Sequence, residues 1–200
     1  EGLSERSVLV GDVMTDVLLK VRDAVLAGGE PNPLADVDAP DGYYVATIHR
    51  AENTDDPERL REVAEALGAA DKPVVLLAHP RVRAKAAEHG VDLETGSLVV
   101  RDPLAYPQLI AAALGSAGVV TDSGGLQKEA FLLRVPCTTV RRETEWGETV
   151  ELGWNVLANT AEEITAALTR PAPAATEAAP YGDGRAATRA VDAIVERIGA

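Results

Sequence analysis

Residues 119–131, VVTDSGGLQKEAF, change character twice within thirteen positions. An apolar, β-branched run ends in Thr121 and Asp122, a serine and two glycines follow, and the remainder has the residue types of a helix. This order is typical of a buried strand that turns directly into the next helix of an α/β protein. It also predicts a place where a ligand meets the N-terminus of that helix.

The same alternation of apolar runs and helical spacing recurs about seven times along the chain. The predicted strands are SVLV (7–10), YYVATI (43–48), PVVLLA (73–78), SLVV (97–100), GVVT (118–121), PCTTV (136–140) and NVLA (155–158). The predicted helices include residues 12–27, residues 57–70 with Pro57 in the first turn, and residues 161–170, which Thr160 opens. Apolar strands joined by helices predict a parallel sheet covered on both faces, so we expect a Rossmann-like, doubly wound α/β fold.

Low-order stretches divide the chain. We expect residues 1–170 to form the α/β domain, residues 171–184 to be a tether rich in Pro, Ala and Gly, and residues 185–200 to form a C-terminal helix. The chain opens at Glu1 without a methionine, which indicates a start inside or just ahead of a domain.

Composition narrows the function classes. The 200 residues are 46% hydrophobic, enough for one packed core, and 32 acidic against 19 basic residues give a formal charge of -13. This charge argues against nucleic acid or an anionic membrane as a partner, so an anionic ligand would need a local positive pocket. Cys137 is the only cysteine, and no apolar run approaches the roughly 20 residues of a membrane helix. We expect a cytoplasmic protein.

Ligands of open parallel sheets bind beyond the carboxyl ends of the strands. The segments that follow the predicted strands bring two of the three histidines, His49 and His79, to that edge. Arginines gather at the same edge: Arg50, Arg81, Arg83, Arg101, Arg141 and Arg142. The sequence therefore predicts a basic rim on an acidic domain.

Ser123, Gly124 and Gly125 can hold a phosphate. Ser123 can cap the helix that follows, and the two glycines let an anion approach free amides at the positive end of the helix dipole. Glu129 lies one turn further on, where its carboxylate could accept two hydrogen bonds from a ribose diol. Two plainer alternatives stay open: a tight strand-to-helix turn at the glycines, and a solvated helix residue at Glu129.

The segment HRAENTD (49–55) pairs a titratable donor, His49, with a fixed cation, Arg50. This pair suits a diphosphate leaving group whose charge grows as a bond breaks, with His49 as the electrophilic partner. Glu52 and Asn53 could instead be ordinary loop and turn residues. His79 could equally be a half-buried, hydrogen-bonded imidazole fixed before Pro80.

Several chemistries are excluded by the absence of their motifs. The sequence has no zinc spacing, no G-x-x-x-x-G-K-[ST] phosphate loop and no G-x-S-x-G elbow. A nicotinamide dehydrogenase is disfavoured because no G-x-G-x-x-G follows the first predicted strand.

Taken together, HRAENTD, HPRVR, DPLAYPQL, VVTDSGGLQKEA, VPCTTVRRETEWGETVELGWNVL and YGDGRA resemble the C-terminal half of a non-hydrolysing UDP-N-acetylglucosamine 2-epimerase. The motifs are in the family's order from about Gly11 to the end. The resemblance implies the GT-B architecture, in which two Rossmann-like domains face a cleft and the last helix crosses to the first domain. It implies as partners UDP or a UDP-sugar, a missing N-terminal domain in cis or in trans, and a homodimer.

The resemblance also assigns roles to matching residues. Ser123, Gly124 and Gly125 would bind the diphosphate, Glu129 the ribose hydroxyls, and His49 would assist the departure of UDP. Leu109 and the segment around Tyr106 would wall the uracil. Substrate contacts are implied for three further residues of these motifs: Arg50, His79 and Arg81.

The implied reaction removes the C2 proton of the sugar, expels UDP from C1, and returns both so that C2 is inverted, as from the N-acetylglucosamine to the N-acetylmannosamine sugar. It needs no metal and no nicotinamide cofactor. Because the family's carboxylates that handle the C2 proton belong to the N-terminal domain, we expect this chain to bind UDP or a UDP-sugar without turning it over.

Two positions depart from the family pattern. Trp146 replaces a common arginine on the phosphate side, and Leu109 gives a smaller base wall than the phenylalanine of some members. Other proteins that resemble this variant, also with GDVM (11–14) near the start, act on UDP-sugars modified at C3 or C6, so the sugar stays open. Two other functions stay in play: the donor domain of a GT-B glycosyltransferase, and a non-catalytic UDP-sugar-binding subunit. HRAENTD and RETEWGE favour the epimerase.

Overall fold

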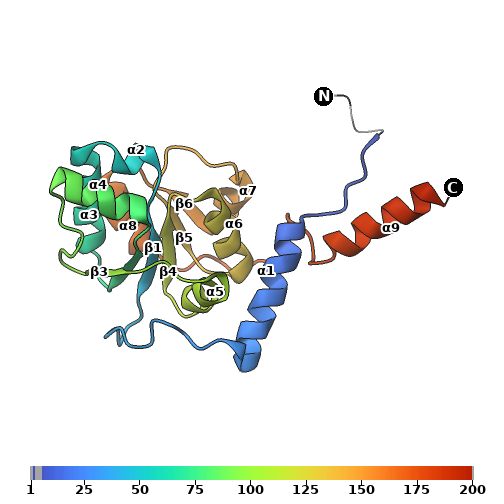
Figure 1. The fold of residues 1–200 in the computed structure, drawn as a ribbon, viewed down its shortest axis with the longest axis horizontal. Helices are drawn as coiled ribbons and strands as arrows, with labels where there is room; N and C mark the ends of the chain where they lie inside the picture. Colours follow the sequence, from blue (N-terminus) through green and yellow to red (C-terminus); the bar gives the residue numbers. More distant parts are fainter. Residues whose placement is uncertain (1, 3–5, 200) are drawn as a thin grey trace.

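The computed structural model describes residue 2 and residues 6–199. Its centre is a parallel sheet of six strands in the order β3-β2-β1-β4-β5-β6 (Figure 1). The strands are β1 Tyr44–Thr47, β2 Val74–Leu77, β3 Leu98–Arg101, β4 Gly118–Thr121, β5 Cys137–Thr139 and β6 Asn155–Leu157. The winding reverses between the adjacent strands β1 and β4, so their carboxyl ends flank the topological switch point. The predicted doubly wound α/β fold is confirmed.

Helices cover both faces of this sheet. Their bounds are α1 Val13–Ala24, the π-helical turn η2 Val25–Gly29, α2 Ala51–Thr54, α3 Pro57–Gly68, α4 Pro80–His89, α5 Tyr106–Leu114, α6 Gly124–Leu133, α7 Gly147–Glu151, α8 Ala161–Leu168 and α9 Ala186–Ile198. One face packs on α3, α4 and α8, and the other packs on α1, α5 and α6. Neighbouring strand residues alternate between the two cores, with Ala46 on the first face and Val45 on the second.

Local signals start the helices where the sequence predicts. The Asp56 carboxylate caps α3 by accepting the amides of Glu58 and Arg59, and Pro57 occupies the first helical position. Thr160 begins α8 in a capping box with Glu163.

The predicted strand at residues 7–10 is wrong, because this segment has no regular structure. Val8 is 65% exposed and Leu9 96% exposed. No strand of the described residues lies beside the segment to supply backbone partners, and an apolar run alone does not make a strand. The predicted helix at 12–27 is regular over residues 13–24, and it passes into η2 after Ala24.

The C-terminal region is anchored before it leaves the domain. Residues 171–184 contain no helix or strand, yet Tyr181 is buried and its ring meets Phe131 and Trp146 edge-on. The α9 helix then extends away from the sheet beside α1 (Figure 1). Its N-terminus is held by the Asp16 carboxylate, which accepts the amides of Ala186 and Ala187 at 3.0 and 2.7 Å.

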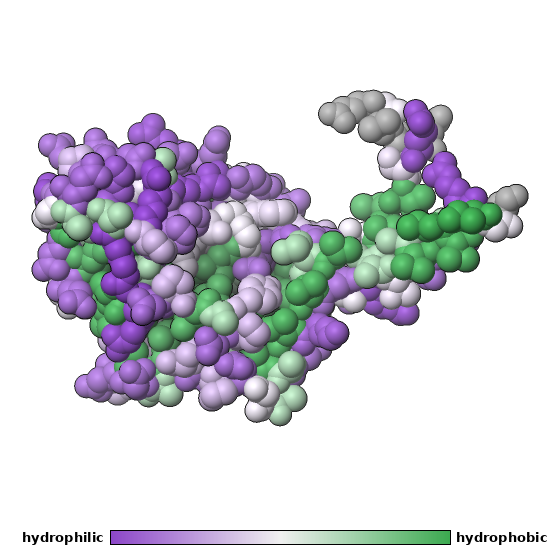
Figure 2. Space-filling view, viewed as in Figure 1, coloured by the Kyte–Doolittle hydropathy of each residue, from purple (hydrophilic) through white to green (hydrophobic). Residues whose placement is uncertain are grey.

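The projecting α9 exposes apolar side chains that nothing in the described chain covers (Figure 2). They are Val191, Ile194, Val195 and Ile198. No helix of the described residues is long and apolar enough to cross a membrane.

Candidate functional site

A pocket of about 370 Å³ opens at the carboxyl ends of β1 and β2, between the segment before α5 and the N-terminus of α6. We call it the α6 pocket. It is lined by Thr47, His49, Leu77, His79, Pro103, Leu104, Tyr106, Leu109, Ser123, Gly125, Leu126 and Glu129. The structure therefore brings together seven residues that the sequence singled out: His49, His79, Tyr106, Leu109, Ser123, Gly125 and Glu129.

The walls of the α6 pocket differ in character. The segment that leads from β3 into α5 contributes a largely apolar wall through Pro103, Leu104 and Leu109. The ends of β1 and β2 contribute the imidazoles of His49 and His79, whose ring centroids are 5.9 Å apart. An elongated ligand with an aromatic part and an anionic part matches such a pocket.

The first turn of α6 presents free hydrogen-bond donors. Among the described residues, none accepts a hydrogen bond from the amides of Gly124, Gly125 or Leu126. Ser123 occupies the N-cap position, but its hydroxyl makes no capping bond, so the expected cap is wrong. A β-carbon on Gly125 would meet only the Ser123 hydroxyl, at 4.0 Å, which leaves this amide open to an anion.

Glu129 faces the α6 pocket from the second turn of α6, and it is not a freely solvated helix residue. The Tyr106 hydroxyl donates a hydrogen bond of 2.9 Å to Glu129 Oε1. Burial raises the pKa of Glu129, and the bond from Tyr106 and the charge of Lys128 oppose that rise. A half-buried carboxylate of this kind can accept hydrogen bonds from ligand hydroxyls.

His49 is held by a buried carboxylate that the sequence reasoning did not single out. Asp122 follows β4 directly and is fully buried. Its oxygens accept the amides of His49 at 3.0 and 3.1 Å and of Arg50 at 2.9 Å, and the Asn53 side chain at 3.1 Å. His49 Nδ1 lies 3.1 Å from Asp122 Oδ1. The sequence signal that could have indicated this role is an acidic residue at the end of an apolar strand, because a charge buried there needs several hydrogen-bond donors.

The pair of Asp122 and His49 shifts both pKa values. The hydrogen bond that His49 donates to Asp122 raises the pKa of His49, against burial and the nearby charge of Arg50. Burial alone would raise the pKa of Asp122, but the hydrogen bonds from His49, Arg50 and Asn53 hold it below its ordinary value.

Three residues predicted to bind substrate do not line the α6 pocket. Arg81 is paired with Asp55 and donates to the Thr54 hydroxyl at 3.1 Å. Arg50 lies 3.9 Å from Glu145. Gly124 faces the same Glu145, whose Oε2 lies 3.5 Å from where a β-carbon would be.

Most of the predicted basic rim is neutralised by acidic neighbours. Arg141 is buried and binds both oxygens of Glu145 at 2.8 and 3.0 Å, and this contact lowers the pKa of Glu145 to about 2. Arg83 and Arg101 pair with aspartates. Among the described residues, no ion pair involves Arg142.

Trp146 packs against its neighbours by a hydrogen bond and a contact with a cation. Its indole Nε1 donates to the Gly124 carbonyl at 2.6 Å. The Lys128 ammonium lies 4.7 Å from the centre of the Trp146 ring and also pairs with Asp12. An arginine at position 146 would repel this buried lysine.

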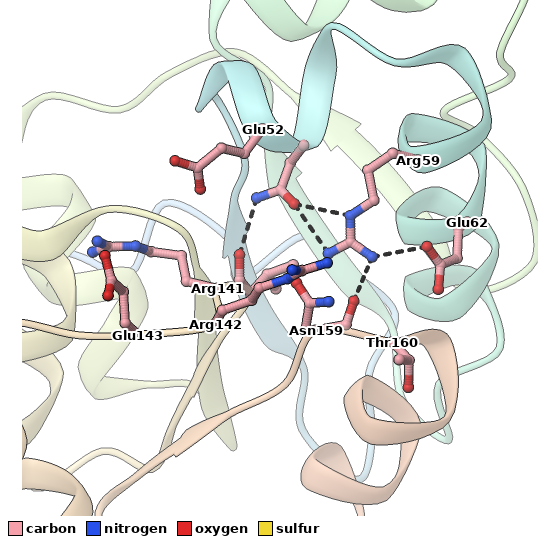
Figure 3. A pocket seen from close by; sticks show the side chains of 10 residues that line it. Glu52, Arg59, Glu62, Arg141, Arg142, Glu143, Asn159 and Thr160 are labelled. Atoms are coloured by element: carbon pink, nitrogen blue, oxygen red, sulfur yellow. Dashed lines mark hydrogen bonds and ion pairs between the residues drawn. The ribbon is translucent and has the colours of Figure 1, made fainter.

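A larger pocket of about 680 Å³, which we call the Arg59 pocket, is lined by residues of α2 and α3 and by the segments that follow β5 and β6 (Figure 3). The Arg59 guanidinium donates to Asn53 Oδ1 at 3.1 Å and to Glu62 Oε2 at 2.8 Å. Asn53 in turn donates to Asp122 and to the Val140 carbonyl. Glu52 lines this pocket too and lies outside the α6 pocket.

No group of three or more His, Cys, Asp or Glu side chains in the described part of the chain has an arrangement that could hold a metal ion. The fold and the α6 pocket together define a Rossmann-like protein whose ligand site joins free helix amides, an imidazole and a carboxylate.

Comparison with known proteins agrees with this class. Residues 1–195 match the family model described as UDP-N-acetylglucosamine 2-epimerase. The chain is 40% identical over 195 residues to the UDP-2,3-diacetamido-2,3-dideoxy-D-glucuronate 2-epimerase of Pseudomonas aeruginosa, covering 94% of this chain and 52% of that protein. It is 32% identical to a UDP-N-acetylglucosamine 2-epimerase homolog of Methanococcus maripaludis, with 97% of this chain and 56% of the relative covered.

Solved structures give the same result. The UDP-GlcNAc 2-epimerase of Methanocaldococcus jannaschii, in complex with UDP-GlcNAc and UDP, superposes with a TM-score of 0.79 at 29% identity, over 94% of this chain and 54% of that one. The chain belongs to the UDP-N-acetylglucosamine 2-epimerase family. It spans about half the length of the curated relatives it matches, in agreement with the expected C-terminal half of a GT-B enzyme.

Proposed function

We propose that the chain is the UDP-binding half of a nucleotide-sugar 2-epimerase and that the α6 pocket holds the UDP. The observation that carries this proposal is the lining of one pocket by an imidazole, free helix amides and a half-buried carboxylate. Such a combination matches the three parts of UDP, namely diphosphate, ribose and an aromatic base.

In this proposal the diphosphate lies at the N-terminus of α6. Amides of Gly125 and Leu126 donate to its oxygens, and the positive end of the helix dipole favours its charge. Gly124 joins them when the Glu145 side chain moves from its face. His49 and His79 contact the anion from the ends of β1 and β2.

The nucleoside occupies the rest of the pocket. Glu129 accepts hydrogen bonds from the two ribose hydroxyls, in competition with the Tyr106 hydroxyl that it binds in the absence of ligand. Leu109 and the neighbouring apolar wall cover the uracil. Arg50 and Arg81 contact substrate only after release from Glu145 and Asp55.

The reaction proceeds by elimination and re-addition. A base removes the proton at C2, those electrons form a double bond to C1, and the C1–O bond breaks with its electron pair on the diphosphate of UDP. Return of a proton to the other face of C2 and of UDP to C1 gives the inverted sugar. His49 lowers the barrier to departure by donating to the leaving diphosphate.

The base is supplied from outside this chain, so the chain alone binds without turnover. The partner is an N-terminal domain, in cis or in trans, that closes over the α6 pocket and covers the apolar face of α9. The substrate is a UDP-2-acetamido sugar. This class includes the compounds named for the Pseudomonas aeruginosa and Methanocaldococcus jannaschii relatives.

Isothermal titration of the chain with UDP tests binding. We expect saturable binding that Glu129→Ala weakens by about 1 to 3 kcal/mol, the range for hydrogen bonds to a charged group. Glu162→Ala, which removes an exposed carboxylate from α8, is the matched control and should bind as the wild type does. Equal affinity of the Glu129→Ala variant and the wild type would exclude the proposed ribose contact.

Exchange of the C2 proton with solvent tests whether the base lies outside this chain. UDP-N-acetylglucosamine incubated with the chain in deuterium oxide should keep its C2 proton, whereas the complete enzyme should replace it and produce the C2-inverted sugar. Deuterium at C2 with the chain alone would show that the base lies within these residues. Transfer of the sugar to an added acceptor would indicate a glycosyltransferase.

A further inference from the structure

Asp122 is a buried charge that accepts hydrogen bonds from several donors. It receives the amides of His49 and Arg50 and the side chain of Asn53, all between 2.9 and 3.1 Å. Donors occupy both carboxylate oxygens, so the group has no place for a proton of its own. Asp122 is therefore a fixed anion at the end of β4.

The His49 ring has only one orientation that suits this anion. Its Nδ1 lies 3.1 Å from Asp122 Oδ1, and because an ionised carboxylate can only accept, Nδ1 carries the hydrogen. The other ring nitrogen, Nε2, is free to serve the α6 pocket, which His49 lines with a side chain that is 40% exposed.

Other charged and titratable groups also face His49. Arg50, its neighbour in sequence, opposes a positive charge on the imidazole. His79, at the start of α4, places its ring 5.9 Å away, and Glu129 and Tyr106 reach the same pocket from α6 and α5. Asp122 is the group that is in direct contact with the ring nitrogen.

Asn53 fixes Asp122 from behind. Its Oδ1 accepts from the Arg59 guanidinium, which identifies the other side-chain atom as the Nδ2 that donates to Asp122. Asn53 and Asp122 are both nearly inaccessible to solvent, with exposures of 2% and 0%. A rigid chain of contacts thus runs from Arg59 to the imidazole.

We propose that Asp122 is a positioning residue that holds the His49 imidazole through Nδ1, favours its cationic form, and thereby makes Nε2 the hydrogen-bond donor to the departing diphosphate. The part concerning the diphosphate rests on the proposed function. As the C1–O bond breaks, its electron pair goes to the phosphate oxygen, which accepts from Nε2–H while the proton stays on the ring. Asp122 itself touches neither substrate nor reacting atoms.

Nitrogen NMR of the 200-residue chain labelled in its histidines tests this without any ligand. His79→Gln and His89→Gln variants assign the three imidazoles. We expect His49 to titrate above the ordinary value of about 6.5 and, when neutral, to carry its proton on Nδ1. A titration at or below that value, or a neutral form protonated on Nε2, would overturn the proposal whether or not a variant of Asp122 folds.

Variants separate positioning from a structural role. Asp122→Asn should lower the measured pKa of His49, since it removes the adjacent charge. Asn53→Ala should lower it less, because the carboxylate remains. Asp36→Asn, an exposed carboxylate paired with Arg101, is the control and should leave the titration unchanged. A folded Asp122→Asn protein with an unchanged His49 titration would contradict the proposal, whatever its thermal stability.

The two proposals fail separately. If UDP did not bind while His49 titrated as expected, the proposed function would be wrong, but the proposed contact between Asp122 and His49 would remain supported. If UDP bound normally while His49 titrated as a free imidazole, only the role of Asp122 would be rejected.

Discussion

The Tyr106 hydroxyl and the Glu129 carboxylate join α5 to α6 across the α6 pocket by a hydrogen bond of 2.9 Å. Burial and the adjacent Glu129 charge raise the pKa of Tyr106, so this hydroxyl stays protonated and keeps a hydrogen to donate to the carboxylate or to a ligand. The bond keeps Glu129 oriented in the absence of ligand, and ribose hydroxyls must replace it or share the carboxylate.

Tyr106→Phe should therefore have a pH-dependent effect. The hydrogen bond from Tyr106 lowers the pKa of Glu129, so its loss raises that pKa further. Near neutral pH the variant should bind UDP within a few fold of the wild type, since a single hydrogen bond is worth roughly 0.5 to 1.5 kcal/mol. Calorimetry at decreasing pH should show affinity lost earlier in the variant. Parallel curves for the two proteins would contradict the proposed link.

Affinity for the nucleotide sugar should be greatest between two titrations. Glu129 binds hydroxyls best when ionised, and its raised pKa means that this contribution is lost as the pH falls toward and below the ordinary carboxyl range. His49 binds the diphosphate best when protonated, so its contribution is lost as the pH rises through its raised pKa. UDP-N-acetylglucosamine is the suitable titrant, because its diphosphate does not ionise further in this range. An affinity that does not change with pH would reject both contacts.

The free energy of unfolding should also depend on the protonation of His49. Because the pKa of His49 is raised by folding, its protonation stabilises the folded chain below the unfolded value of about 6.5, and this contribution disappears as the pH rises through the folded pKa. His49→Gln should therefore lower the melting temperature at pH 5 to 6 and have less effect at pH 9. A deficit that grows with pH would have the wrong sign.

In the complete enzyme, His49→Ala should reduce kcat more than it weakens substrate binding, because the contact strengthens as charge develops on the leaving diphosphate. Rapid-mixing measurement of UDP-sugar dissociation alongside turnover separates the two effects. A variant with normal kcat and weaker binding would make His49 a ground-state ligand only.

The apolar face of α9 should matter for association and not for UDP. Ile194→Asp places a charge in the middle of this exposed face. The chain should keep its UDP affinity, and it should lose affinity for a separately produced N-terminal domain in sedimentation or calorimetry. Glu196→Gln, an exposed change on the same helix, is the control. Equal association of the Ile194→Asp variant would exclude this face as the contact.

Sequence periodicity was sufficient for the fold because strands and helices here are decided by burial. Residues 74–77 are buried on both faces and were predicted as a strand, and Pro57 and Thr160 begin helices where predicted. The prediction of a strand at 7–10 was wrong because residue types alone do not make a strand. A strand also needs a neighbouring strand to pair with, and none lies beside residues 7–10 among the described residues.

The residues of the α6 pocket whose positions depend on the backbone alone could be predicted from the sequence. His49 and Ser123 follow strands, and Glu129 follows from helical spacing, so topology alone brings them together. The ion pairs of Arg50 and Arg81 depend on side-chain rotamers and on acidic neighbours, which spacing does not reveal. Asp122 was missed because its role depends on amides from a distant loop.

A crystal structure of the chain soaked with UDP tests the central claim most directly. We expect the diphosphate on the amides of Gly125 and Leu126 within reach of His49, the ribose diol on Glu129, and the uracil against Leu109. UDP bound in the Arg59 pocket, or an α6 pocket that stays empty at saturating UDP, would contradict the account.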